Sequence, residues 1–229
     1  MFCAEWCLVK RTRPGLTIIP LRCRCWTCEE CQPRRRSQLI REGVRGKPNL
    51  FITLTSVYRP GGSPAAAARA LVCAWRKVRE EYIKVHGKGS LPFLAVFEAT
   101  LNGWPHLHII ARAKWVSQKW LSKRMAALTG AKIVWVERIK GGRRTVNYVT
   151  KYVGKEPMRF ATVKRYWRSQ DYLLPSDEQE GEEEELLEPW RIVQQNWIDY
   201  ANSLANILVQ PVFTRNSIVI IDGDLRCTS

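Results

Sequence analysis

Two histidines separated by one residue, His106 and His108, are the clearest chemical signal in the chain. They lie in the apolar run WPHLHIIA, whose β-branched residues and alternation predict a strand. Residues i and i+2 of a strand face the same side, so both imidazoles share one face and Leu107 takes the other. Glu98, on the preceding predicted strand, adds a carboxylate. Such ligands suit Mg²⁺, Mn²⁺ or Zn²⁺ by type, and an incomplete shell open to phosphate oxygens favours Mg²⁺ or Mn²⁺.

The hairpin between the two strands decides whether the carboxylate reaches the histidines. A two-residue loop at 102–103 would place Glu98 opposite Leu107, on the wrong face. A three-residue loop at 101–103, with a left-handed glycine last, places it opposite His106. We favour this second register because it also brings apolar side chains of both strands together on the other face. The alternative is that the histidines are only hydrogen-bonded structural residues.

Two tyrosines form a second candidate site. Tyr148 and Tyr152 are four apart in a segment that predicts a short helix, so they share a face, and Lys151 and Lys155 border it. A tyrosine hydroxyl has a pKa near 10. Neighbouring cations favour the phenolate, which can attack phosphorus. The alternative is an amphipathic helix that merely packs two tyrosines.

In chain order, FITLT, FEATLNGWPHLHII and YVTKYVGK resemble the three motifs of the HUH endonuclease superfamily. Within it the chain is similar to two-tyrosine rolling-circle replication initiators (Rep proteins) of phages and plasmids, over residues 50–157. The resemblance implies that a tyrosine nicks single-stranded origin DNA, leaving a 5′-phosphotyrosine and a free 3′-OH. It also implies that the His106, His108 and Glu98 site holds Mn²⁺ or Mg²⁺, and that Lys151 supports the phenolate or the phosphate.

The same resemblance implies that the second tyrosine can transfer the strand and close the circle. The implied partners are origin DNA and the host replication machinery, a helicase and a polymerase. A two-tyrosine HUH transposase or a relaxase with the same core is an alternative. An alternative of another class is a non-catalytic zinc-containing nucleic-acid-binding protein.

Six of the eight cysteines fall in the first 31 residues, followed by a run of arginines. Structural zinc takes four ligands, commonly as two closely spaced pairs. The spacing favours Zn²⁺ bound by Cys3, Cys7, Cys28 and Cys31, with Cys23 or Cys25 able to replace one of them. Disulfides or spare thiols are the alternative. Phosphate contacts are expected from Arg34, Arg35, Arg36, Arg41 and Lys155. Trp104, beside the metal face, is a candidate to stack on an unpaired base.

The charge of the chain favours a polyanionic partner. Eight of the 21 acidic residues lie in 177–188, so elsewhere 37 basic residues face only 13 acidic ones. No apolar run is long enough to span a bilayer. The N-terminus has no signal-peptide core. We therefore expect a soluble protein without a membrane partner, in the cytoplasm, which is the host's if the protein is viral.

The elements that position these residues follow the order β-α-β-β-α-β-α between residues 51 and 155. This order predicts an α+β fold, an antiparallel sheet with helices on one face, of the ferredoxin-like kind. Four segments are expected. They are a Cys-rich zinc module at 1–45, the nuclease domain at 46–160, a basic then acidic linker at 161–188, and a C-terminal helix and strand extension at 189–229.

Overall fold

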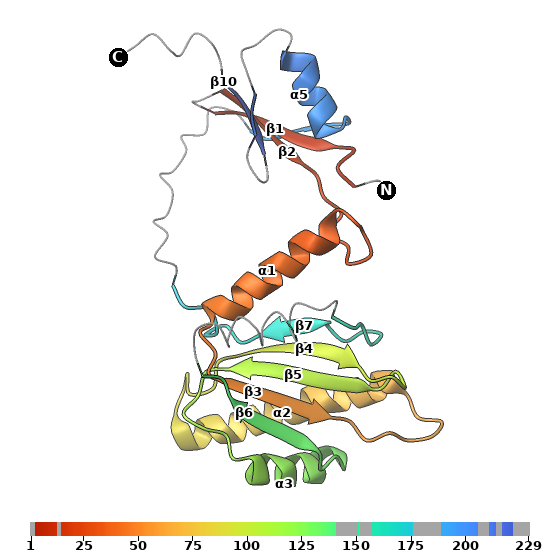
Figure 1. The fold of residues 1–229 in the computed structure, drawn as a ribbon, viewed down its shortest axis with the longest axis vertical. Helices are drawn as coiled ribbons and strands as arrows, with labels where there is room; N and C mark the ends of the chain where they lie inside the picture. Colours follow the sequence, from red (N-terminus) through yellow and green to blue (C-terminus); the bar gives the residue numbers. More distant parts are fainter. Residues whose placement is uncertain are drawn as a thin grey trace. The chain divides into compact units, whose positions relative to one another are not determined.

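The computed structural model describes residues 3–12, 15–140, 151, 157–175, 189–205, 211–213 and 217–221. The chain divides into two compact units (Figure 1). Unit 1 combines Met1–Arg35 with Ser176–Ser229, and unit 2 is Arg36–Pro175. The N-terminal module and the C-terminal extension, expected as separate segments, therefore belong to one unit.

Unit 2 contains a five-stranded sheet in which every described pair of neighbours is antiparallel. The strand order is β6-β3-β5-β4-β7. The first four strands have the ferredoxin-like order, which confirms the predicted α+β architecture. The strands are β3 (Leu50–Thr55), β4 (Phe93–Ala99), β5 (Pro105–Ala111), β6 (Val134–Arg138) and β7 (Tyr166–Arg168).

Two helices pack on one face of this sheet, α2 (Pro64–His86) and α3 (Gln118–Thr129). Figure 1 shows α2 passing behind the strands. The Ser117 side chain accepts a hydrogen bond from the backbone N–H of Trp120 and begins α3, and Gly130 ends it with a left-handed φ of 80°. Both of these helix boundaries were predicted from the sequence.

The core of unit 2 lies between this sheet face and the helices. Alternate residues of each strand point into it, while α2 contributes side chains three and four positions apart. Burying each large side chain completely is worth roughly 1.5–3 kcal/mol. The fully or almost fully buried members include Leu50, Ile52, Leu54, Leu71, Trp75, Val78, Leu107 and Ile109.

Residues 157–175 belong to unit 2 and not to a linker, contrary to the sequence-based expectation. Tyr172 is fully buried and its hydroxyl donates a hydrogen bond to the Gly43 carbonyl at 2.7 Å, within the last turns of α1 (Cys31–Arg45). A Cβ at Gly46 would lie 2.1 Å from the Tyr172 ring, so only glycine admits the ring there. β7 escaped prediction because three residues are too few to show a period.

Unit 1 contains a second antiparallel sheet built from both ends of the chain, in the order β8-β1-β2-β10-β9. Its strands are β1 (Cys7–Thr12), β2 (Gly15–Pro20), β8 (Arg191–Val193), β9 (Pro211–Phe213) and β10 (Ile218–Ile221). The helix α5 (Trp197–Ala205) packs against β2 and β10. The helix expected from residue 189 thus starts later, because residues 191–193 pair with β1.

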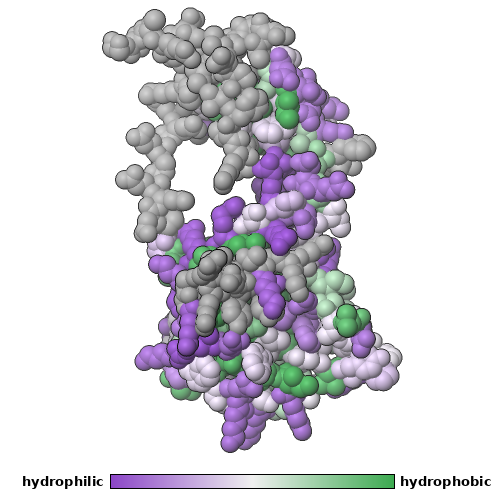
Figure 2. All heavy atoms as spheres, viewed as in Figure 1, coloured by the Kyte–Doolittle hydropathy of each residue, from purple (hydrophilic) through white to green (hydrophobic). Residues whose placement is uncertain are grey.

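The surface of the described residues agrees with these cores. Hydrophilic side chains cover much of the visible surface of unit 2 (Figure 2). Among the described helices, none combines the length and the apolar character that crossing a membrane requires.

Candidate functional site

The hairpin between β4 and β5 has the predicted three-residue register. Glu98 pairs with His106 and Phe97 with Leu107. The Thr100 N–H donates to the Trp104 carbonyl at 2.8 Å, which closes the loop over 101–103. Gly103 has a φ of 75°, which glycine adopts at little cost. The carboxylate and both imidazoles therefore rise from the sheet face opposite α2 and α3.

The three side chains lie close together on that face. Glu98 Oε2 is 2.7 Å from His108 Nε2, and the two imidazole centroids are 6.2 Å apart. His108 is buried at 5% exposure, whereas the Glu98 side chain is 33% exposed and has room to turn. Because Glu98 bonds to His108, small side-chain rotations are needed to direct all three toward one cation.

Thr53 is a further member of this site that the sequence did not single out. It pairs with His108 across β3 and β5, and its Oγ1 lies 3.1 Å from His108 Nδ1. Phe51 stacks on the same imidazole, with centroids 5.6 Å apart. The alternation in FITLT was the available signal, because it puts residues 51, 53 and 55 on the histidine face. Metal-binding histidines commonly hold their second nitrogen in such a hydrogen bond, which fixes the tautomer.

The hydroxyl of Thr53 suits both tautomers of His108. When Nε2–H donates to the Glu98 carboxylate, the Thr53 hydroxyl donates to Nδ1. When Nε2 is a metal ligand, the proton resides on Nδ1 and Thr53 accepts it. One contact thus orients the ring in either state.

The electrostatic surroundings keep His106 a potential ligand. Burial lowers the pKa of His106 below its usual value of 6.5, and the nearby Glu98 charge partly opposes this shift. The imidazole is therefore neutral near pH 7, the form that binds metals.

The tyrosines lie outside the described residues. Tyr148, Tyr152 and Lys155 fall there, and of the tyrosine motif only Lys151, which is exposed, is described. Their roles in catalysis stay predictions.

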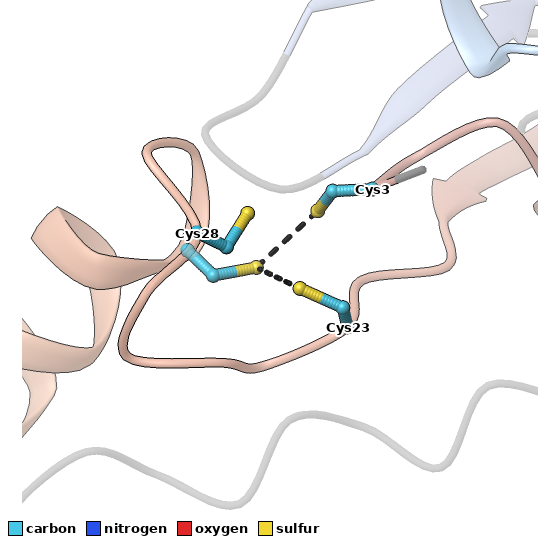
Figure 3. Close-up of side chains that lie close together, drawn as sticks. Cys3, Cys23 and Cys28 are labelled. Carbon is cyan, nitrogen blue, oxygen red and sulfur yellow. Dashed lines mark hydrogen bonds between the residues drawn. The ribbon is translucent and has the colours of Figure 1, made fainter. Parts of the chain in front are cut away.

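The cysteine cluster is the second candidate site (Figure 3). The sulfurs of Cys3, Cys23, Cys28 and Cys31 all lie within 4.8 Å of one another, which is close enough to hold a metal such as zinc. Cys31 Sγ is 3.3 Å from Cys3 Sγ and 3.7 Å from Cys23 Sγ. Zinc–sulfur bonds of about 2.3 Å in a tetrahedron place sulfurs about 3.8 Å apart, so the cluster fits zinc.

Cys23 takes the place in this cluster that the spacing assigned to Cys7. Cys7 is fully buried in β1, where it packs with Val9 and Ile18 in the core of unit 1. The cause is strand alternation, which turns residues 7 and 9 to the same face. Cys25 is exposed, and its backbone N–H donates to Cys23 Sγ at 3.5 Å.

The thiols of the cluster differ in acidity. The backbone N–H of Cys25, together with smaller contributions from the neighbouring thiols, lowers the pKa of Cys23 to about 6. Burial raises the pKa of Cys3 to about 12. One thiolate is thus readily formed, while further thiolates beside it would repel one another. A bound dication removes that repulsion, so metal binding and thiol deprotonation are coupled.

The predicted DNA-binding arginines lie at the start and along the length of α1. Arg34, Arg36 and Arg41 are exposed. Arg35 is half-buried, and its guanidinium lies 4.9 Å from the centre of the Trp26 ring. Packing on that ring gives Arg35 a structural contact in unit 1 in addition to any contact with phosphate.

The tryptophans near the histidine face differ in exposure. Trp104 is only 7% exposed and meets Tyr58 edge-on, with centroids 5.2 Å apart. Trp135 on β6 is 56% exposed and pairs with Thr53, which places it on the histidine face. The alternation in IVWVER was the signal for Trp135, because Val134 and Val136 point into the core.

Residues 49–157 match the model of a family of replication-associated proteins, the ORF2 family. The matched segment contains the histidines, the carboxylate and the tyrosines, and the match supports a replication-initiator family with a role in replication initiation. No curated protein and no solved structure matches the chain significantly.

Proposed function

We propose that the protein is a metal-dependent HUH endonuclease and strand transferase that starts and ends rolling-circle replication. The observation that carries the proposal is the register placing Glu98 and His106 opposite each other, with His108 on the same face. This face belongs to a ferredoxin-like sheet inside the segment that matches a replication-associated family.

The proposed reaction is a transesterification on single-stranded origin DNA. His106, His108 and Glu98 would hold Mn²⁺ or Mg²⁺, which when bound polarises the scissile phosphate. The Oη of Tyr148 or Tyr152 attacks phosphorus, so a Tyr–O–P bond forms as the P–O3′ bond breaks. The 3′ oxygen takes up a proton and becomes the primer end that the host polymerase extends. Lys151 supports the phenolate or the phosphate.

The second tyrosine completes the cycle in this proposal. It cuts the regenerated origin while the first still holds the old 5′ end, and the new 3′-OH then attacks the first phosphotyrosine. Because the ester retains the energy of the cleaved bond, joining requires no ATP. Exposed arginines of α1 and the cysteine-bound zinc would hold the DNA and the segment that grips it.

The test uses labelled oligonucleotides tiled across both strands of the replicon that encodes the chain. Each is incubated with the full chain and Mn²⁺ and run on a denaturing gel, and one strand should give a covalent adduct. The adduct should vanish in the Tyr148→Phe/Tyr152→Phe double variant and fall at least about 100-fold in His106→Ala or His108→Ala, because the metal site is lost. Tyr200→Phe in unit 1 is the matched control and should keep it.

Other outcomes separate the alternatives. DNA binding without an adduct on any strand would contradict the nickase and favour a zinc-containing binding protein. An adduct only on the ends of a mobile element or on a transfer origin would favour a transposase or a relaxase with the same core.

A further inference from the structure

A cavity of about 240 Å³ opens at the end of the sheet beside the histidine face. Two of its lining residues flank the pair formed by Thr55 and His106: Ser56 follows Thr55, and Trp104 precedes His106 by two positions. Two residues of extended strand span about 7 Å. The wall of the cavity therefore begins close to the candidate metal ligands.

The cavity is narrow and mostly apolar. The first turns of α2 line it with Ala66, Ala67 and Ala70, and Trp104 lines it as an aromatic wall. A Cβ at Gly62 would lie 3.1 Å from Trp104 Cη2 and 2.9 Å from the Arg59 carbonyl, so glycine is needed for this close approach. Pockets for drug-sized ligands measure roughly 300–1,000 Å³, so this smaller space suits a single heterocyclic base.

The rim of the cavity carries a cation and an exposed aromatic ring. A tight turn begins at Arg59, where the Gly62 N–H donates to the Arg59 carbonyl at 2.9 Å and Gly61 has a φ of 71°. The turn presents the exposed Arg59 guanidinium beside the end of α3, 3.8 Å from where a Cβ on Gly130 would be. Tyr58, which is 58% exposed, lies against Trp104. Aromatic rings beside positive charge are the usual means of binding single-stranded nucleic acid.

We propose that this cavity receives one unpaired base of single-stranded DNA next to the scissile phosphate, with Arg59 on a neighbouring phosphate and Tyr58 stacked on the adjacent base. The identity of the scissile phosphate rests on the proposed nickase function, whereas base binding does not. A seated base would fix which phosphate reaches His106 and His108. A base stacked in a duplex cannot enter, so the cavity selects single strands.

The test fills the cavity and removes bases from the DNA in turn. Ala67→Phe places a ring in the space, and Ala65→Phe, two positions earlier in α2 and outside the lining, is the matched control. Affinity is measured by fluorescence anisotropy for the origin strand and for strands with one abasic site at each position. In the wild-type chain, one abasic position should weaken binding by about 5-fold to 150-fold, the range for one stacked base.

Ala67→Phe should weaken the intact strand by a similar factor and be insensitive to that same abasic site, whereas Ala65→Phe should behave as wild type. Ala70→Met is a second filling variant in case Ala67→Phe fails to fold, as judged by thermal melting. An adduct that forms normally with no abasic position masked by either filling variant would overturn the cavity and leave the nickase standing. Masking in the binding assay without any adduct would support the cavity and contradict the nickase.

Discussion

The two candidate metal sites of this molecule are built in opposite ways. The cysteine cluster draws its ligands from segments before β1, after β2 and at the start of α1, and surrounds a point with four sulfurs. The histidine site draws on two adjacent strands and Thr53 on a third, and presents nitrogen and oxygen on an open sheet face. A closed sulfur tetrahedron stabilises structure, while an incomplete shell leaves positions for a substrate. The difference suggests that one metal holds the fold of unit 1 and the other would act on DNA.

The largest expected effect comes from breaking the closed site. Cys23→Ser should abolish binding of one equivalent of zinc and unfold unit 1 at a lower temperature, since zinc binding in small domains is worth about 10–16 kcal/mol. Cys7→Ser, which puts a hydroxyl into an apolar core, should keep the zinc and cost only about 1–3 kcal/mol. Zinc content by mass spectrometry and stability by calorimetry measure the two effects.

The same pair of variants also tests the independence of the sites. Mn²⁺ affinity at the histidine site should stay within about twofold in Cys23→Ser, because unit 2 has its own core. Retention of zinc by Cys23→Ser together with its loss in Cys7→Ser would reverse the assignment of the fourth ligand.

A smaller effect is expected when the orientation of one ligand in the open site is changed. Thr53→Val keeps the shape of the side chain but removes the hydroxyl that contacts His108 Nδ1 at 3.1 Å. Loss of such a partner commonly lowers metal affinity 10–100-fold, so we expect at least about a tenfold loss of Mn²⁺ affinity by calorimetric titration.

Two further variants distinguish orientation from packing. Thr53→Ser should restore most of the affinity because it restores the hydroxyl, and Thr55→Val on the same face should have little effect. An affinity in Thr53→Val equal to wild type would show that Phe51 and Glu98 alone hold the imidazole.

The contrast in construction also explains what the sequence could predict. The partners Glu98 and His106 followed from strand parity and the left-handed Gly103, because a period of two leaves few registers. The loops around Cys23 and Cys28 have no period, so spacing alone could not choose between Cys7 and Cys23. β7 and the joint sheet of unit 1 depend on pairing between segments far apart in the chain, which local patterns do not encode. Thr53 and Trp135 were accessible from alternation once their strands were paired.

The smallest expected effect concerns the opposite responses of the two units to pH. Burial raises the pKa of Tyr172 in unit 2 well above its usual value of 10. The folded state therefore keeps this proton at pH values where the unfolded chain has lost it, so the stabilisation is complete below pH 10 and is lost as the pH rises above it. The loss should be at most about 1.4 kcal/mol per pH unit.

Tyr172→Phe removes the titrating group and should make the stability of unit 2 less dependent on pH above 10. It should also cost about 1 kcal/mol at neutral pH, because the hydrogen bond to the Gly43 carbonyl is lost. Unit 1 should respond in the other direction, since acid protonates cysteine ligands and releases zinc. Urea unfolding followed between about pH 8 and 11 measures the Tyr172 effect, and equal slopes for wild type and Tyr172→Phe would contradict it. A unit 1 that keeps its zinc at acid pH would remove the contrast from the other side.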